Sequence, residues 1–357
     1  MRSFWLVLTG IGIVVFAGAG VAEEVEVLPE VRVTPPQIYT TPAEAGTLPV
    51  ATTPLRREAL VFDVPAAVTV QPGDYIRQRR MARSATDAML NLAGVMVQKT
   101  APLQSSPYIR GFTGSRTLLL IDGIRLNNSA FRSGPNQYWS TIDSYTIERL
   151  ELARGPNSVL YGSDAVGGTV NVITQRRESF ERGWYAGGLL SSRMASAENA
   201  FFGRLQAEGN YDTIGFLGGA TWKEMGDVVS GDGHLPYTGG ITELDGDIRF
   251  DIPIDPRWTI VAAYQHVGQD DAPRTHKTVH AVPFNGSTVG SELRRDYNQR
   301  RDLGYVRAEF ESDCGPIRSA RLGVSIHRHW EERDRLRTRD REDLSGFKLY
   351  QYGVQYQ

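Results

Sequence analysis

Alternating apolar and polar residues fill the second half of the chain, from about residue 183 onward. In the segment 244–252, the even positions are mostly apolar, whereas the odd positions carry Asp245, Asp247, Arg249 and Asp251. Similar segments of roughly ten residues lie at 184–191, 200–209, 214–224, 242–252, 258–268, 303–312, 317–330 and 346–356. Their length and alternation predict antiparallel strands of a transmembrane barrel, with one side toward lipid and the other toward the lumen.

A soluble β-sandwich alternates as well, so the pattern alone leaves two fold classes open. Aromatic residues near the ends of the segments favour the membrane barrel, whose strands carry aromatic girdles at both interfaces. These aromatic residues are Trp222, Trp258, Tyr264 and Trp330.

The links between the segments also favour a barrel, because short and long links alternate. The short links are 210–213, 253–257 and 313–316, and the long links are 225–241, 269–302 and 331–345. Bacterial outer-membrane barrels have short periplasmic turns and longer extracellular loops. We therefore expect 269–302 to lie outside the cell and 313–316 in the periplasm.

The first half of the chain lacks this regular alternation of apolar and polar residues and divides into three parts. Residues 1–22 combine Arg2, an apolar run over 4–17 and a small-residue cleavage site, as a secretory signal peptide does. A membrane anchor is the alternative, but the apolar run is shorter than the ~20 residues that a spanning helix needs. Residues 23–60 are rich in proline and predict a flexible linker. Residues 61–175 predict a compact α+β unit.

Composition narrows the class of protein further. The chain has 357 residues, 41% hydrophobic and 22% charged, which suits neither a disordered protein nor a helical membrane protein. Its single cysteine, Cys314, cannot form a disulfide within the chain. The formal charge of −2 gives no indication of a nucleic-acid partner. The histidines form neither a HExxH motif nor a catalytic triad, so we expect no enzymatic activity, no cofactor and no resident metal.

Several long motifs in the α+β unit are similar to the plug domain of TonB-dependent outer-membrane receptors. They occur in the family's order at 107–112 (PYIRGF), 118–123 (LLLIDG), 147–156 (IERLELARGP), 158–162 (SVLYG) and 167–174 (GGTVNVIT). The resemblance extends over roughly residues 28–357 and is densest in 84–175. It implies an α+β plug domain over 61–175, followed over 176–357 by antiparallel strands of an incomplete large barrel in the outer membrane.

The resemblance also implies a site for energy coupling near the N-terminus. An alternating segment resembles a TonB box, which consists here of Leu28, Pro29, Glu30, Val31, Arg32, Val33 and Thr34. Such a segment can pair as an added strand with a partner's sheet. The implied partner is periplasmic TonB with its inner-membrane motor, which draws on the proton gradient. The alternative is that this segment is only part of a disordered tail.

A second implied site is a polar network between the plug and the barrel wall. Its candidate residues are charged and lie in or near the plug motifs: Arg110, Glu148, Arg149, Glu151 and Arg154. A polar lumen lets such groups stay hydrated or paired. The alternative is that each of them is ordinary surface charge.

Length predicts that the barrel is incomplete. Plugged outer-membrane transporters have about 22 strands, and the residues after 175 provide room for about eight. A plug with a radius of gyration near 13 Å cannot fit inside an eight-stranded barrel. We therefore expect the chain to be the first part of a larger barrel and not to transport anything by itself.

The ligand is the least determined part of the prediction. His276 and His280 lie in the longest link, and His327 and His329 share the expected lumen face of one strand. Together they suggest binding of haem iron or a ferric siderophore, although solvated polar residues would look the same. The open alternatives are a non-transporting outer-membrane surface protein, a signalling receptor, and an importer of cobalamin or another non-iron ligand.

Overall fold

The computed structural model describes residues 49–131, 133–177, 183–231, 233–281, 289–312, 314–339 and 341–357. The predicted signal peptide and the TonB-box residues 28–34 lie outside the described residues. No helix in the described part of the chain is long and apolar enough to cross a membrane.

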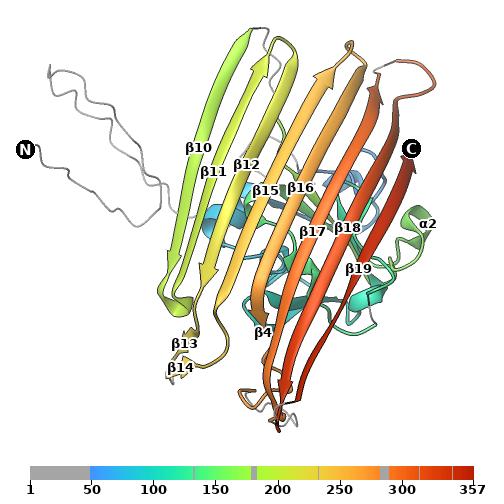
Figure 1. The fold of residues 1–357 in the computed structure, drawn as a ribbon. Helices are drawn as coiled ribbons and strands as arrows, with labels where there is room; N and C mark the ends of the chain where they lie inside the picture. Colours follow the sequence, from blue (N-terminus) through green and yellow to red (C-terminus); the bar gives the residue numbers. More distant parts are fainter. Residues whose placement is uncertain are drawn as a thin grey trace, which may run out of the picture.

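Eight long antiparallel strands form one continuous sheet, in which each strand pairs with the next along the chain (Figure 1). They are β10 (Trp184–Ala195), β11 (Ala200–Tyr211), β12 (Ile214–Met225), β15 (Ile241–Pro253), β16 (Trp258–Pro273), β17 (Glu292–Glu311), β18 (Ser319–Arg337) and β19 (Arg341–Tyr356). A small hairpin, β13 (Val228–Ser230) and β14 (Gly233–Leu235), lies in the link between β12 and β15. The sheet is open, because β10 and β19 are its two edges among the described residues. The fold class predicted from the sequence is thereby confirmed.

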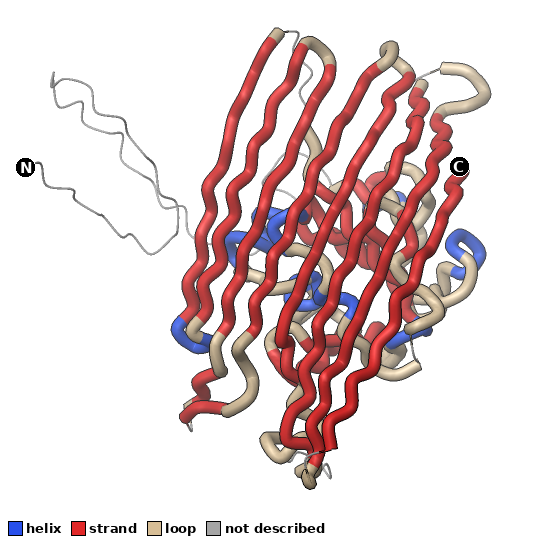
Figure 2. Tube along the Cα trace, viewed as in Figure 1, coloured by secondary structure: helices blue, strands red, loops and turns tan. Residues whose placement is uncertain are grey.

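The plug packs against one face of this sheet (Figure 2). Its central sheet has the order β3 (Ala67–Pro72), β8 (Ile147–Arg154), β9 (Gly168–Thr174), β6 (Thr117–Ile121) and β7 (Ile124–Arg125), with β6 and β9 parallel. Two strand pairs flank it: β1 (Val50–Ala51) with β2 (Ala59–Leu60), and β4 (Val95–Ala101) with β5 (Gln104–Ile109). The helical elements are short: η2 (Val61–Asp63), η3 (Tyr75–Arg79), α1 (Ala85–Ala88), η4 (Gly114–Arg116), η5 (Tyr138–Ser140), η6 (Ser144–Thr146), α2 (Ser158–Tyr161) and, in the barrel sheet, η7 (Ser196–Glu198).

The plug core follows from the apolar runs of β6, β8 and β9. All five residues of β6 are buried, as a strand of continuous apolar character requires. Asp122 and Gly123 link β6 to β7 with φ values of 51° and 80°, the left-handed conformation of a tight hairpin. The core extends to the barrel wall, because Val261, Leu303 and Tyr305 belong to the same apolar cluster.

The barrel strands at the long-link end are longer than their alternation predicts. β18 and β19 continue over polar residues, so strand replaces 331–337 and 341–345 of the predicted link. The prediction of a long link there is wrong. The apolar side of a barrel strand extends only over the thickness of the membrane. Outside that layer, polar side chains on both faces hide the continuation of the strand.

Candidate functional site

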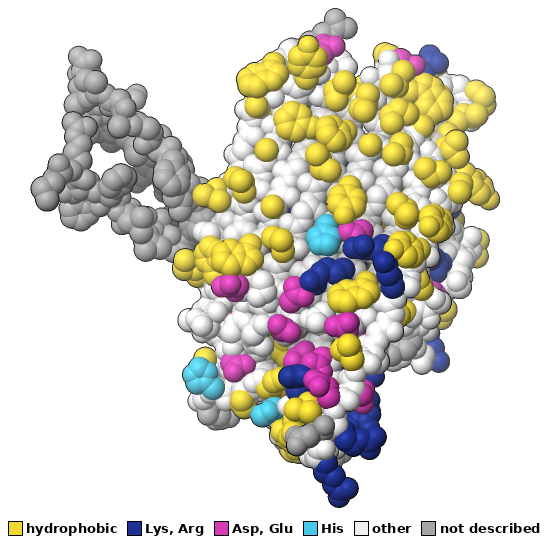
Figure 3. All heavy atoms as spheres, viewed as in Figure 1, with side chains coloured by type: hydrophobic (Ala, Val, Ile, Leu, Met, Phe, Trp, Pro, Cys, Tyr) yellow, Lys and Arg dark blue, Asp and Glu magenta, His cyan; other side chains and the backbone are white. Residues whose placement is uncertain are grey.

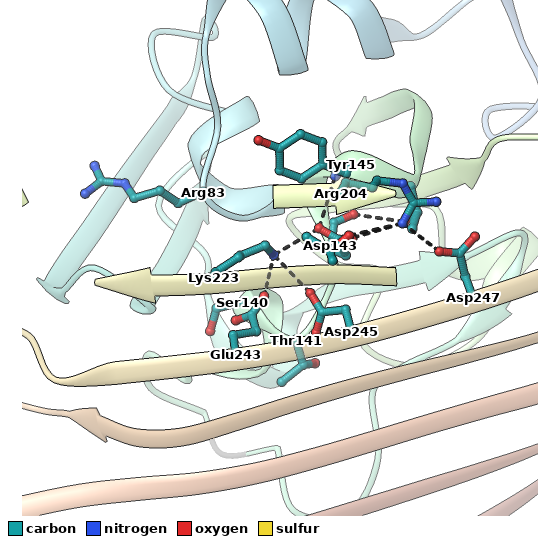
Figure 4. Close-up of polar contacts among 12 residues, drawn as sticks. Arg83, Ser140, Thr141, Asp143, Tyr145, Arg204, Lys223, Glu243, Asp245 and Asp247 are labelled. Carbon is teal, nitrogen blue, oxygen red and sulfur yellow. Dashed lines mark hydrogen bonds and ion pairs between the residues drawn. The ribbon is translucent and has the colours of Figure 1, made fainter. Parts of the chain in front are cut away.

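The plug meets the barrel wall at a buried cluster of charges around Asp143 (Figure 4). Asp143 precedes η6 at the end of a plug loop, and its backbone is fixed because its side chain accepts a hydrogen bond from the Tyr145 amide at 3.2 Å. From the wall, the Lys223 ammonium lies 2.9 Å from Asp143 and the Arg204 guanidinium 3.6 Å. The Thr221 hydroxyl donates to the same carboxylate at 2.6 Å. One plug carboxylate thus joins β11 and β12.

The wall supplies further carboxylates to this cluster. Lys223, which is fully buried, also contacts Glu243 and lies 3.0 Å from Asp245. Arg204 pairs with Asp247 at 2.8 Å. These residues share the lumen face because neighbouring residues of a strand point to opposite sides of the sheet. Buried charges are tolerated only where they are paired and hydrogen-bonded, and the cluster meets that condition across the interface.

The electrostatics of Asp143 follow from this arrangement. Burial alone raises the pKa of a carboxyl group, but the charges of Lys223 and Arg204 and the hydrogen bond from Thr221 together lower the pKa of Asp143 below its ordinary value of 3.8. Asp143 is therefore ionised at neutral pH, and the plug–wall contact is an ion pair.

A second contact is centred on Asp122, at the β6–β7 turn. The Tyr305 hydroxyl donates to the Asp122 carboxylate at 2.9 Å, and Arg307 donates to its backbone carbonyl at 2.9 Å. Gln355 donates to the Gly123 carbonyl at 2.8 Å. Within the plug, the same carboxylate accepts from the Thr174 amide and hydroxyl. The left-handed turn thus presents its backbone carbonyls to the wall, while the Asp122 side chain accepts hydrogen bonds from β9.

A third contact involves the plug loop at 137–141. The Gln269 side chain donates to the Ser140 carbonyl at 2.9 Å, and the buried Arg301 donates to the Thr141 carbonyl at 2.6 Å. Gln137 donates to the Glu331 carboxylate. Backbone carbonyls are therefore the main acceptors that the plug offers to β16 and β17.

The five residues predicted for the plug–barrel network have a different placement. Arg149 pairs with Glu148 and Glu151, at 2.8 Å each. Glu151 accepts hydrogen bonds from the Thr52 and Thr53 amides at 2.9 and 2.7 Å. Arg154 donates to the Ala93 carbonyl and to the Thr69 hydroxyl.

Arg110 is exposed in a left-handed turn, and its amide donates to the Gly94 carbonyl. The described hydrogen bonds and ion pairs of Arg110, Arg149, Glu151 and Arg154 thus lie within the plug and its N-terminal segment. The reason is position: β8 is central in the plug sheet, between β3 and β9. The residues that reach the wall include Asp122 and Gly123, which lie in a recognised motif, and loop residues outside the motifs such as Thr141 and Asp143.

The four predicted ligand histidines form two separate pairs. His276 and His280 line a cavity of about 1000 Å³ at the long-link end, between the β4–β5 hairpin and the links after β14 and β16. Other charged and aromatic residues of the cavity are Lys99, Tyr108, Arg274 and Lys277. His327 and His329 are buried on β18 against the plug, where the His329 ring lies 4.7 Å from the Tyr138 ring. The structure does not bring the two pairs together.

Comparison with known proteins agrees with this architecture. Residues 61–169 match the family described as TonB-dependent Receptor Plug Domain. The chain is 28% identical over 283 residues to the vitamin B12 transporter BtuB of Vibrio vulnificus (strain CMCP6), covering 76% of this chain and 45% of the relative. The solved copper transporter OprC superposes with a TM-score of 0.65 at 17% identity, over 82% of this chain and 42% of that one. The siderophore receptor PirA from Acinetobacter baumannii gives 0.57 at 15% identity, over 81% and 45%.

The fold and these matches define the class of protein, a plug domain packed against the inner face of part of an outer-membrane β-barrel. The match of residues 61–169 to the plug domain and the similarity of the chain to TonB-dependent receptors confirm the resemblance seen in its motifs. Members of this family are receptors and transporters rather than enzymes. The chain spans slightly under half the length of the relatives that it matches.

Proposed function

We propose that the receptor containing this chain actively imports a scarce nutrient, with a ferric siderophore or a haem-type iron ligand as its substrate. The observation that carries the proposal is the cavity at the long-link end. It combines the cationic side chains of Arg274 and Lys277 with the histidines 276 and 280, and Lys99, which pairs with Asp87, also lines it. The remaining lining combines apolar and aromatic residues, Met96, Tyr108 and Leu235 among them, with uncharged polar residues such as Gln98 and Ser105.

This lining suits an anionic chelate with apolar parts. Cations that line a cavity raise the local concentration of anions, and ligand pockets are mostly apolar with a few polar groups that fix orientation. The volume of about 1000 Å³ is at the upper end of ordinary small-molecule sites. Cobalamin is the second candidate, favoured by the 28% identity to a vitamin B12 transporter.

A binding experiment on the complete receptor separates these ligands. Ferric siderophores of catecholate and hydroxamate type, haem and cobalamin would each be titrated against the purified receptor. We expect an anionic iron ligand to bind, and Arg274→Gln with Lys277→Gln to weaken it at least tenfold. Arg257→Gln with Arg318→Gln, at the opposite rim of the sheet, is the matched control. Binding of cobalamin alone would replace the iron proposal by the second candidate.

Energy coupling through residues 28–34 is the other half of the proposal. Val31→Pro removes a backbone donor and restricts the preceding residue, so it should disrupt strand pairing with TonB. In cells carrying the complete receptor, we expect uptake of the labelled ligand to fall to background while binding to the same cells is unchanged. Ala45→Pro, in the proline-rich linker, is the control and should leave uptake intact. Import at the wild-type rate by Val31→Pro would show that this segment is not the coupling site.

A further inference from the structure

Five side chains of alternating charge connect the cavity at the long-link end to the barrel wall. Lys99, on β4, lines the cavity and contacts the Asp87 carboxylate of α1. Asp87 accepts from the Arg83 guanidinium at 3.1 Å, and the same guanidinium lies 2.7 Å from the Glu198 carboxylate. Glu198, in the turn η7 between β10 and β11, also pairs with Arg193 at 2.9 Å. These five residues are called the ion-pair series here.

Burial differs along the ion-pair series. Asp87 and Glu198 are each 5% exposed, whereas the side chains of Lys99 and Arg83 are 27% and 23% exposed. Burial alone would raise the pKa of the Asp87 carboxyl group, but the charges of Lys99 and Arg83 hold this pKa below its ordinary value of 3.8. Asp87 is therefore ionised at neutral pH. A buried carboxylate must remain paired, so the loss of one cation from Asp87 increases its attraction for the other.

Arg83 is the member of the series that joins the plug to the wall. Its Nε donates to Asp87 in the plug, and its Nη1 donates to Glu198 in the wall. If the guanidinium moves fully onto Asp87, Glu198 still has Arg193 as its partner. Neither buried carboxylate is then left unpaired, which is the usual cause of a large cost when an ion pair breaks. This contact can therefore open at a lower cost than the contact through Lys223.

The ion-pair series lies on the lumen side of the wall, beside the Asp143 cluster. Arg193 is directly opposite the buried Phe202, and its guanidinium lies 4.7 Å from the centre of that ring. It therefore faces the plug, behind the hydrophobic and acidic side chains that Figure 3 shows on the outward face of the sheet. Ser84 forms a backbone bridge with Asp143, and Figure 4 shows the neighbouring Arg83 at the margin of that cluster. A shift of Arg83 thus acts close to a second contact with the same part of the wall.

The cavity end of the series is suited to an anion. None of the described residues that line the cavity is an aspartate or a glutamate. Lys99 carries its ammonium on a flexible four-carbon stem, so the ammonium can turn from Asp87 toward a group in the cavity. Hydrogen bonds from an ammonium to an anion are about as strong in either place. An anionic ligand and Asp87 can therefore compete for the same cation.

We propose that an anionic ligand takes Lys99 from Asp87, and that this exchange releases the plug from the wall at Glu198. The inference rests on the proposed function, which supplies the anion. With Lys99 on the ligand, Asp87 keeps only Arg83 and draws it away from Glu198, which stays paired with Arg193. Asp87 is thus a positioning residue for Lys99. Because coupling between two equilibria is reciprocal, loosening the contact at Glu198 should in turn strengthen binding of the anion.

The first test needs no ligand, because removing the charge of Lys99 reproduces its loss from Asp87. Hydrogen exchange of the peptide 81–90 is measured in the complete receptor, with heat-modifiable migration as the check of folding. We expect Lys99→Gln to lower protection at least fivefold. Adding Asp87→Asn should restore protection to within twofold of wild type, because a neutral side chain no longer draws Arg83 from the wall. Adding Asp63→Asn, an exposed plug residue, is the control and should restore nothing. A loss that Asp87→Asn leaves unrestored would overturn the exchange.

The second test adds the anion, with ferric enterobactin and haem as the probes. Asp87→Asn should bind the active probe at least fivefold more tightly than wild type, because Lys99 is no longer shared, and Asp63→Asn should match wild type. Glu198→Gln should also bind it more tightly. Its control is Glu224→Gln, an exposed residue near the same end of β12, which should leave affinity unchanged. Bound probe should lower the protection of peptide 81–90 in wild type and leave it unchanged in Asp87→Asn.

Failure of this inference and failure of the proposed function give different results. A probe that binds wild type and Asp87→Asn equally would overturn the exchange and leave iron import standing. Weaker binding to Asp87→Asn would do the same, because it would show that Asp87 supports the cavity rather than competing with the anion. Absence of binding by both probes, with the rescue of Lys99→Gln still observed, would overturn the proposed ligand class and support the link between Lys99 and the wall.

Discussion

Lys223 shows how a single side chain can hold two parts of this molecule together. Its ammonium is completely buried and contacts one carboxylate of the plug and two carboxylates of the wall strand β15. Taking such a group out of water costs several kcal/mol, and the partners offset this cost only while all of them are present. The residue therefore contributes most to positioning, since any displacement of the plug leaves charges unpaired.

Replacing this lysine should loosen the plug. Lys223→Met keeps much of the apolar stem but leaves Asp143, Glu243 and Asp245 without their shared cation. We expect the free energy of plug detachment to fall by about 3–5 kcal/mol, the usual loss when one partner of a buried pair is removed. Urea-dependent proteolysis of the plug in the complete receptor measures this. Lys277→Met, on an exposed loop, should change it by less than ~0.5 kcal/mol. Equal resistance of both variants would contradict the role of Lys223.

Acid should weaken the same contact, in a direction fixed by Asp143. Because the pKa of Asp143 in the folded protein lies below its ordinary value of 3.8, the carboxylate stabilises docking fully above that value. This stabilisation disappears as pH falls through the lowered pKa. Hydrogen exchange of the plug loop 137–146, followed from pH 6 to pH 3, should show protection that drops only at the acid end. In Asp143→Asn, protection should be lower at pH 6 and nearly independent of pH, and a wild-type profile in this variant would exclude Asp143 as the cause.

Sequence predicted which residues face the lumen but not what they meet there. Alternation placed Asp245, Asp247, Arg249 and Asp251 on one side of their strand, and all four are found on the plug side. Asp143 carries no comparable signal, because it lies in a loop whose position relative to the wall depends on the whole plug. Charges in the plug motifs were the natural candidates, yet those of β8 bond within the plug and its N-terminal segment.

At the scale of elements, the extension of β17, β18 and β19 beyond the apolar band changes the expected outer surface. Paired strands, rather than long irregular links, carry the chain over 292–302, 331–337 and 341–345. Alternation could not reveal this, because its apolar half vanishes where the strand leaves the lipid. The short links were easier to predict, since they follow apolar segments directly and leave room only for a turn.

The native thiol provides a test of which rim faces the cell interior. Cys314 is exposed in the short link between β17 and β18, which we expect to be periplasmic. A membrane-impermeant maleimide should leave it unlabelled in intact cells that express the complete receptor, and label it after the outer membrane is permeabilised. The companion variant carries Cys314→Ser and Val279→Cys, in the link after β16, and should be labelled on intact cells. The opposite pattern would invert the assigned orientation.

At the scale of the whole molecule, the sequence predicts the plug in more detail than the barrel wall. The plug could be predicted from long ordered motifs, whose glycines and turns fix the backbone. The plug-domain family matches residues 61–169. The barrel part was inferred from periodicity and from size, since a plug of this length cannot fit inside eight strands. The open sheet with β10 and β19 at its edges agrees with that inference. The ligand of the receptor depends on loop residues. Sequence periodicity does not show which of these residues lie close together in the fold.

The contact between Glu151 and the N-terminal segment has a consequence for how that segment can leave the plug. A single buried carboxylate accepts from two consecutive amides, those of Thr52 and Thr53, and from both of their hydroxyls. Such an arrangement resembles a chelate, in which breaking one bond hardly lowers the cost of breaking the next. We therefore expect the segment to leave the plug in one step, with all four bonds lost together when the preceding chain is pulled hard enough.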